Sequence, residues 1–272
     1  MGEPIILQFL AGSMEMVVSS FIILFALFVI AALYSSVGHG GASGYLAVLS
    51  LTVYASQDPS WLKQHAWSLN LLVAGLAFWA YSRAGFFDSK LALSFMIASV
   101  PAAIFGGLLR IDNGIYDTLL SITLMLAAWR LLVVKNNDSD EIFVKSPPIY
   151  ITVIVGFTIG FLSGIVGVGG GIFLSPIILL FGWADAKTTA GIAAAFIWVN
   201  SAAGLVGNSI SGQLEIDFGV LLPFTIAVVL GGLIGSRVGS KVFSQIVVRR
   251  MLVSVLFLAA IKRILDLAIS VF

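Results

Sequence analysis

The chain has 272 residues, of which 60% are hydrophobic and 10% carry a formal charge. Soluble domains carry about 25% charged residues, so this composition excludes a soluble globular domain and predicts a membrane protein. The net charge of +1 gives no sign of a nucleic-acid partner, and the absence of cysteine excludes disulfides and thiolate metal sites.

The apolar segments predict an all-α polytopic membrane protein, because uncharged runs of more than about 18 residues can span a bilayer. The first half, 1–134, is predicted to form one membrane repeat, and the second half, 149–272, to form the other. The polar stretch 135–148 is predicted to be a cytoplasmic linker. The expected segments, in chain order, are 17–37, 42–56, 65–82, 91–109 and 115–134, then 149–166, 171–183, 188–209, 217–236 and 248–268.

Two glycine-rich runs, 36–41 and 165–171, occupy matching places in the two halves. Aligning them places Asn70 near Asn200, which supports a structural repeat. The stretch 16–57 around the first run has 42 residues without a formal charge. As one helix it would be about 63 Å long, twice the thickness of a bilayer core. Each glycine run is therefore predicted to lie in a hairpin that returns to its own side.

The distribution of lysine and arginine predicts how the repeats are oriented. If each hairpin returns to its own side, ten basic residues lie on one side and four on the other, whereas a single crossing gives seven on each. The uneven split favours the hairpins, since cytoplasmic loops carry an excess of Lys and Arg. Each repeat then has an odd number of crossings, so the second is inverted and both termini face the non-cytoplasmic side. Residues 1–16 lack Lys and Arg, which argues against a cleavable signal peptide.

The glycine runs also suggest a binding site. Helices that begin after them, at about Ala42 and Ile172, would present unpaired backbone N–H groups and a partial positive charge. Two such ends meeting near the midplane would bind a small oxyanion without any buried Lys or Arg. Broken helices at matching places in two halves are a pointer to a transporter's binding site. The predicted binding residues are Ser35, Ser36, Gly38, His39, Gly40, Gly41, Ser43, Asn70, Ser163, Gly167, Gly169, Gly170, Gly171, Asn200 and Ser201.

Several of these residues have an alternative structural reading. An asparagine in mid-membrane is either a ligand or an interhelical hydrogen bond, and Ser201 beside Asn200 strengthens the ligand reading there. For Asn70 the structural role is favoured. His39 would suit proton coupling or attraction of an anion, or it donates one structural hydrogen bond. His65, at a helix start, is interpreted as structural.

Arg110 and Arg237 follow the fourth segment of each half. Interfacial anchoring is the default role for such residues, and a gate that attracts the anion is the alternative. Tyr34, Trp67 and Trp198 line the pathway or pack within the bundle. Gly156, Gly160 and Gly164 recur every fourth residue, as do Gly231, Gly235 and Gly239, and this spacing lets helix backbones approach closely.

The sequence contains few of the residues and motifs that enzyme catalysis requires. The second glycine run lacks the preceding strand and the later acidic residue of a dinucleotide-binding loop. The two histidines have no carboxylate at ligand spacing. We therefore expect no nucleotide, metal or other cofactor and no enzymatic activity.

The segment GFLSGIVGVGGG, residues 160–171, followed by Pro176, resembles the signature of the sulfite exporter TauE/SafE family of membrane proteins. The stretch 188–204 is similar to the helix that follows in that family. The first run matches more loosely, because His39 replaces an apolar residue and Ala42 stands where a third glycine is expected. The resemblance covers nearly the whole chain. It implies export, or in some members uptake, of small sulfur oxyanions and organosulfonates across the inner membrane.

The leading hypothesis is a secondary transporter in a prokaryotic inner membrane, exporting sulfite, thiosulfate or an organosulfonate by alternating access. Its expected partners are this anion and the lipid bilayer, and assembly as a homodimer is left open. One alternative is a channel-like anion facilitator, and another is an uptake permease for the same anions. A membrane-embedded enzyme or assembly subunit is a third, weakened by the shortage of acids, bases and metal ligands in the apolar segments.

Overall fold

The computed structural model describes residues 20–110 and 146–251, apart from 249, and all the regular elements in these ranges are helices. This confirms the predicted all-α fold for the described residues. The expected segment 115–134, the linker as far as 145, and nearly all of the segment 248–268 lie outside them. Four helices within the described ranges are long and apolar enough to cross a membrane, namely Ser89–Leu108, Ile149–Val166, Ala186–Ile210 and Phe218–Val242.

The helices follow the predicted order in both halves. The first half contains a helix at Ser20–Ser35, then α2 (Ala42–Ser50), α3 (Pro59–Arg83) and α4 (Ser89–Leu108). The second contains α6 (Ile149–Val166), α7 (Gly171–Leu180), α8 (Ala186–Ile210) and α9 (Phe218–Arg237), which continues into the π-helical turn η1 (Val238–Val242). Each half thus has a short helix, α2 or α7, directly after its glycine run.

The start of α3 departs from the predicted bounds as far as the end of α2 does, which is Ser50 where 56 was expected. The helix begins at Pro59, whereas the expected segment begins at 65. The Asp58 side chain accepts a hydrogen bond from Ser60 N. A proline stands in the first turn, where a backbone N–H group has no partner within the helix and is therefore not needed. Aspartates cap three other long helices in the same way, at Asp88 for α4, Asp185 for α8 and Asp217 for α9, whereas α6 begins after Pro148 without a side-chain cap.

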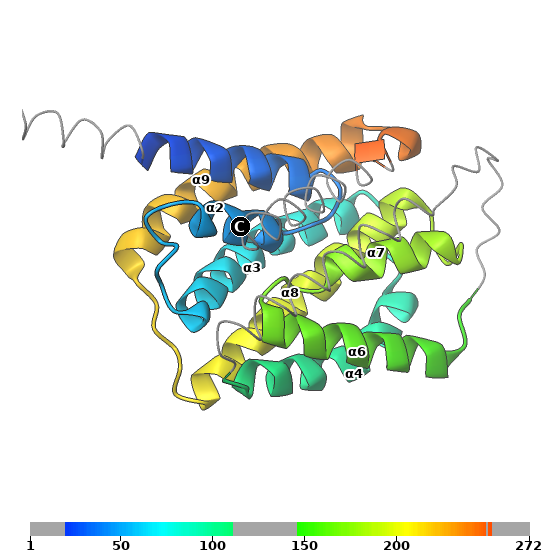
Figure 1. Cartoon of the computed structure of the whole chain (residues 1–272). Coiled ribbons are helices and arrows are strands. Elements are labelled where there is room, and N and C mark those ends of the chain that lie inside the picture. The colour runs from blue at the N-terminus through cyan, green and yellow to red at the C-terminus, as the bar shows by residue number, and fades with distance from the viewer. Residues whose placement is uncertain (1–19, 111–145, 249, 252–272) are drawn as a thin grey trace, which may run out of the picture.

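Helices α3 and α8 form the centre of the bundle and run antiparallel (Figure 1). Their register is set by close contacts along their length, in which Gly75 meets the indole of Trp198 and Gly204 meets that of Trp67. Figure 1 shows α4 and α6 on one side of this pair, and α9 with the helix Ser20–Ser35 on the other.

The two outer pairs pack through glycines spaced four residues apart. On α6, a side chain at Gly156, Gly160 or Gly164 would overlap a backbone carbonyl of α4. On α9 and η1, a side chain at Gly231, Gly235 or Gly239 would overlap backbone carbonyls of Phe28, Ala32 and Ser36. This confirms the predicted packing role. Since the contacts advance together along both chains, each outer pair is parallel.

The directions of the helices relate the two halves. Helix α9 runs parallel to α3, as the contacts His65–Asp217 and Val73–Gly232 indicate, whereas α8 runs antiparallel to it. Together with the parallel outer pairs, this makes each described long helix of the first half run opposite to its counterpart in the second (Figure 1). Inverted repeats require this geometry. The repeat relation itself and the orientation in a membrane stay predictions.

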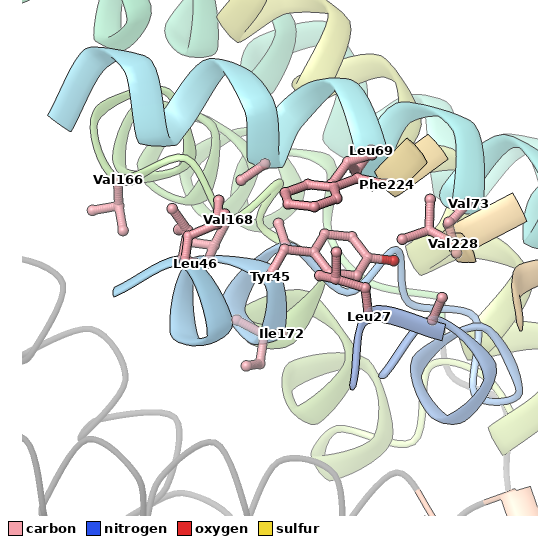
Figure 2. Packing of buried hydrophobic residues seen from close by; sticks show 14 of the residues in the cluster. Leu27, Tyr45, Leu46, Leu69, Val73, Val166, Val168, Ile172, Phe224 and Val228 are labelled. Carbon is pink, nitrogen blue, oxygen red and sulfur yellow. The ribbon is translucent and has the colours of Figure 1, made fainter. Parts of the chain in front are cut away.

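A core cluster draws on both halves around the short helices. Leu27, Tyr45, Leu46, Leu69 and Val73 of the first half pack with Val166, Val168, Ile172, Phe224 and Val228 of the second (Figure 2). Large apolar side chains also cover the outside, for example Ile154 on α6 at 63% exposure and Ile226 on α9 at 64%. An apolar outer surface of this kind suits a bilayer, in which lipid replaces water as the solvent.

Candidate functional site

The glycine runs break the helices as predicted. Gly41 begins α2 with a φ of 99° and Gly170 begins α7 with a φ of 80°, both in the left-handed region. Gly167 ends α6 with a φ of 88°. No side chain of the N-cap residue closes the start of α2 or α7, so first-turn N–H groups are left for other acceptors.

Asn70 on α3 lies between the two breaks. Its Oδ1 accepts a hydrogen bond of 3.1 Å from Ala42 N, in the first turn of α2. Its Nδ2 donates to Ser201 Oγ on α8 at 2.9 Å. A side chain added to Gly40 would overlap this carboxamide, and one added to Gly169 would lie 2.5 Å from Asn70 Nδ2 and 3.1 Å from Ser201 Oγ. The structure therefore brings both glycine runs to one buried amide.

His39 reaches from the first glycine run toward α7. Its Nδ1 lies 3.1 Å from Val37 O, and its Nε2 lies 3.5 Å from Ser175 Oγ in α7. The ring is 2% exposed. Nearby, Tyr34 Oη and Ser43 Oγ are 3.1 Å apart and tie the end of the first helix to the start of α2. His39 thus contacts both halves at the site.

A second polar group surrounds Gly170. Asn200 Nδ2 donates to Ser99 Oγ at 3.2 Å and to Phe196 O at 2.8 Å. A side chain at Gly170 would meet the ring of Phe196 and the Cβ of Ser163. Within the described residues, Asn200 Oδ1 and Ser163 Oγ are buried and have no hydrogen-bond partner. Asn200 therefore makes an interhelical hydrogen bond, which is one of the two roles predicted for it. Its Oδ1 remains free to accept another hydrogen bond.

Other predicted residues lie away from this cluster. The hydroxyls of Ser35 and Ser36 bond back to carbonyls of their own helix, which packs on α9. Gly38 packs against the backbone of Ala190 in α8. Gly171, in contrast, lies at the cluster, because it meets Ile197, which also borders Gly169. Arg110 and Arg237 are both exposed, Arg110 after α4 and Arg237 at the end of α9. The structure places neither arginine at the glycine runs.

One buried cation beside the second glycine run was not among the predicted site residues. Lys63 on α3 is 2% exposed, and its side chain lies against Gly167. Its ammonium lies 5.8 Å from the ring centroid of Trp67. The signal for it was the sequence Asp58-Pro59, because a cap there starts α3 early and places Lys63 one turn inside the bundle. His65, read as structural, accepts from Asp217 N through Nε2 and pairs through Nδ1 with Trp61 O.

Comparison with known proteins assigns the chain to a family. The pattern of the sulfite exporter TauE/SafE family matches residues 23–263. The chain belongs to this family. It is 34% identical to a probable membrane transporter protein, y4hK, of Sinorhizobium fredii over 240 residues, which cover 87% of the chain and 95% of that protein. It is 28% identical to the probable membrane transporter protein YunE of Bacillus subtilis over 249 residues, or 82% of the chain and 88% of that protein. No solved structure matches.

Membership in the TauE/SafE family makes the chain an integral membrane protein of a transporter family. Its relatives carry the general description of membrane transporters. Within the described residues, no cluster of three or more His, Cys, Asp or Glu side chains is arranged to hold a metal ion.

Proposed function

We propose that this TauE/SafE protein is a secondary transporter that exports a small sulfur oxyanion, such as sulfite, thiosulfate or an organosulfonate. The anion binds near the midplane, between the first turns of α2 and α7. The two halves then rearrange around it to open the site to alternate sides of the inner membrane.

The observation that carries the proposal is the meeting of both glycine runs at Asn70. Gly40 and Gly169 approach the same carboxamide from the two halves, and Asn70 bonds to α2 and α8 at once. Glycine lets backbone N–H groups approach a ligand, and helix N-termini favour negative charge. Ser163, which lies beside Gly170, and Asn200 each keep a buried side-chain oxygen without a partner in the described residues, and these oxygens can orient a protonated or hydrated oxyanion.

The membrane potential sets the favourable direction. Moving one negative charge outward gains about 2.3 kcal/mol per 100 mV, inside negative. A divalent anion gains about twice as much. Export therefore proceeds without a coupled proton, whereas uptake of the same anion requires one.

A counterflow assay in liposomes tests this function. Purified protein is reconstituted into liposomes loaded with unlabelled sulfite, and the uptake of labelled sulfite is followed across a panel of competing anions. A transporter gives saturable counterflow that thiosulfate or an organosulfonate inhibits. Flux that never saturates and shows no counterflow identifies a channel-like facilitator, and the absence of any sulfur-oxyanion flux contradicts the proposal.

A further inference from the structure

A cavity of about 340 Å³ lies at the end of the bundle where α3 begins. The loop between α8 and α9 forms its opposite wall, and the end of α4 contributes Arg110. Residues of its lining include Asp58, Ser60, Lys63, Arg110, Gln213 and Glu215. The wall is held together by hydrogen bonds that join Gln64 of α3 to the backbone of Gln213 and Glu215. The cavity is therefore a built feature of the fold.

Lys63 connects this cavity with the second glycine run. The residue lines the cavity, and its stem packs on Gly167, where a glycine Cβ would lie 2.9 Å from Lys63 Cγ. The residue is 2% exposed, and within the described residues no hydrogen bond or close ion pair joins its ammonium to another group, although the Asp58 carboxylate interacts with it electrostatically. Asp58, the carboxylate in the same lining, accepts from Ser60 N as the cap of α3.

A buried cation without a paired carboxylate is costly and is typically retained for a function. Trp67, one turn further along α3, adds a second donor. Its indole N–H is buried and unpaired in the described residues, and the Lys63 ammonium lies beside its ring. Two unused donors, one of them cationic, form the chemistry that holds an oxyanion through charge-assisted hydrogen bonds.

We infer that Lys63 holds the oxyanion at a second station, between the site at Gly169 and the cavity at the α3 end. This inference rests on the proposed function and adds to it a cation on the exit side of the export pathway. Arg110 stands in the same cavity wall and adds positive charge that attracts the anion toward the exit. Lys63 is thus a substrate-binding residue, distinct from the exposed arginine.

Substitutions at Lys63 test the inference by removing the charge of the side chain while keeping its aliphatic stem. Lys63→Gln preserves most of the packing on Gly167, while Lys63→Arg preserves the charge. Lys187→Gln is the matched control, because Lys187 is also a buried lysine at a helix start, but its ammonium donates to Ser240 O at the other end of the bundle. Two quantities are measured for each variant: the half-saturation concentration for sulfite counterflow, and the rise in thermal unfolding temperature of the detergent-solubilised protein on titration with sodium sulfite.

We expect Lys63→Gln to raise the half-saturation concentration about tenfold, the usual scale for losing one charge-assisted hydrogen bond. The sulfite concentration needed for thermal stabilisation should rise in parallel, with Lys63→Arg close to the wild type and Lys187→Gln unchanged. If Lys63→Gln does not fold, Lys63→Met supplies the uncharged variant. The inference is overturned if both readouts for Lys63→Gln match those of the wild type, or if Lys187→Gln weakens sulfite binding equally. If the wild-type protein binds sulfite and this binding depends on Lys63, but no counterflow occurs, the transport function is refuted while the role of Lys63 in binding stands.

Discussion

At the scale of single residues, Asn70 is the side chain at which the two glycine runs meet. Sequence reasoning favoured a structural role, and its two hydrogen bonds are structural in form. They nevertheless fix the first turn of α2 against α8 at the point where the glycine runs converge. A residue that sets this geometry affects both folding and the site.

Asn70→Leu removes the acceptor of Ala42 N and the donor to Ser201 Oγ. We expect a loss of about 1–3 kcal/mol of stability, because a buried amide group is left unpaired, and a loss of counterflow per folded molecule. Gln245→Leu is the matched control, since the Gln245 amide also bridges a helix start, accepting from Lys187 N and donating to Asp185 Oδ1. Thermal unfolding and counterflow are measured for both. Equal transport by the two variants would show that Asn70 acts in packing alone.

His39 is the residue that distinguishes the two glycine runs, because Val168 stands at its matching position. Histidine is the side chain that changes charge between pH 5 and 8 without special surroundings. If it attracts the anion, transport of an organosulfonate, whose own charge is fixed over this range, is faster at low pH, and His39→Ala flattens that dependence. Ser175→Ala removes the hydroxyl beside Nε2 and no titrating group. A pH dependence that survives in His39→Ala would make His39 structural.

At the scale of elements, the sequence was most informative where helix breaks and packing depend on local signals. The glycine runs, the short helices after them and the glycines spaced by four residues could all be predicted, because each follows from backbone sterics. The start of α3 was missed because an Asp-Pro cap outweighs the hydropathy of the residues after it. That shift of nearly two turns hid Lys63 from the predicted site.

Gly160→Leu tests the packing of α6 on α4. The added side chain collides with the backbone of Ser99, so we expect at least about 1–3 kcal/mol of destabilisation, as for overpacking in a core. Phe157→Leu changes a side chain on the same helix that is 54% exposed and should leave the unfolding temperature within error. Thermal unfolding in detergent compares them. A stable Gly160→Leu protein would mean that α6 and α4 separate more easily than this geometry allows.

At the scale of the whole molecule, the directions of the helices place the basic residues at two ends. Lys187 contacts Phe86 and Ser240 at one end, while Lys63 and Arg110 share the cavity at the other. The count of Lys and Arg residues on the two sides of the membrane, made from the sequence, assumed this separation. Asn70 and Ser201 were both predicted as binding residues, but the hydrogen bond between them could not be predicted from sequence, because they come together only through the antiparallel crossing of α3 and α8.

Single cysteines test the orientation directly, since the chain has no cysteine of its own. Exposed positions near the Lys187 end, Ser89→Cys and Arg237→Cys, should label from the cytoplasmic side. Gln57→Cys and Ser209→Cys, near the cavity, should label from the opposite side. Impermeant maleimide on intact cells makes the comparison. Labelling of Ser89→Cys and Arg237→Cys from different sides would refute the inverted arrangement.

The central claim is that the two glycine runs form the anion site, and Gly169→Ala tests it most directly. Its φ is 73°, and the added methyl would lie 2.5 Å from Asn70 Nδ2. Gly85→Ala is the matched control, with a φ of 83° and no atom within 4 Å of the added methyl. Both bear a backbone strain of about 1–2 kcal/mol. The close contacts at Gly169 add a further cost, so counterflow is compared per folded molecule. Sulfite counterflow in liposomes is predicted to be abolished by Gly169→Ala and retained by Gly85→Ala; equal counterflow by the two variants would contradict the account.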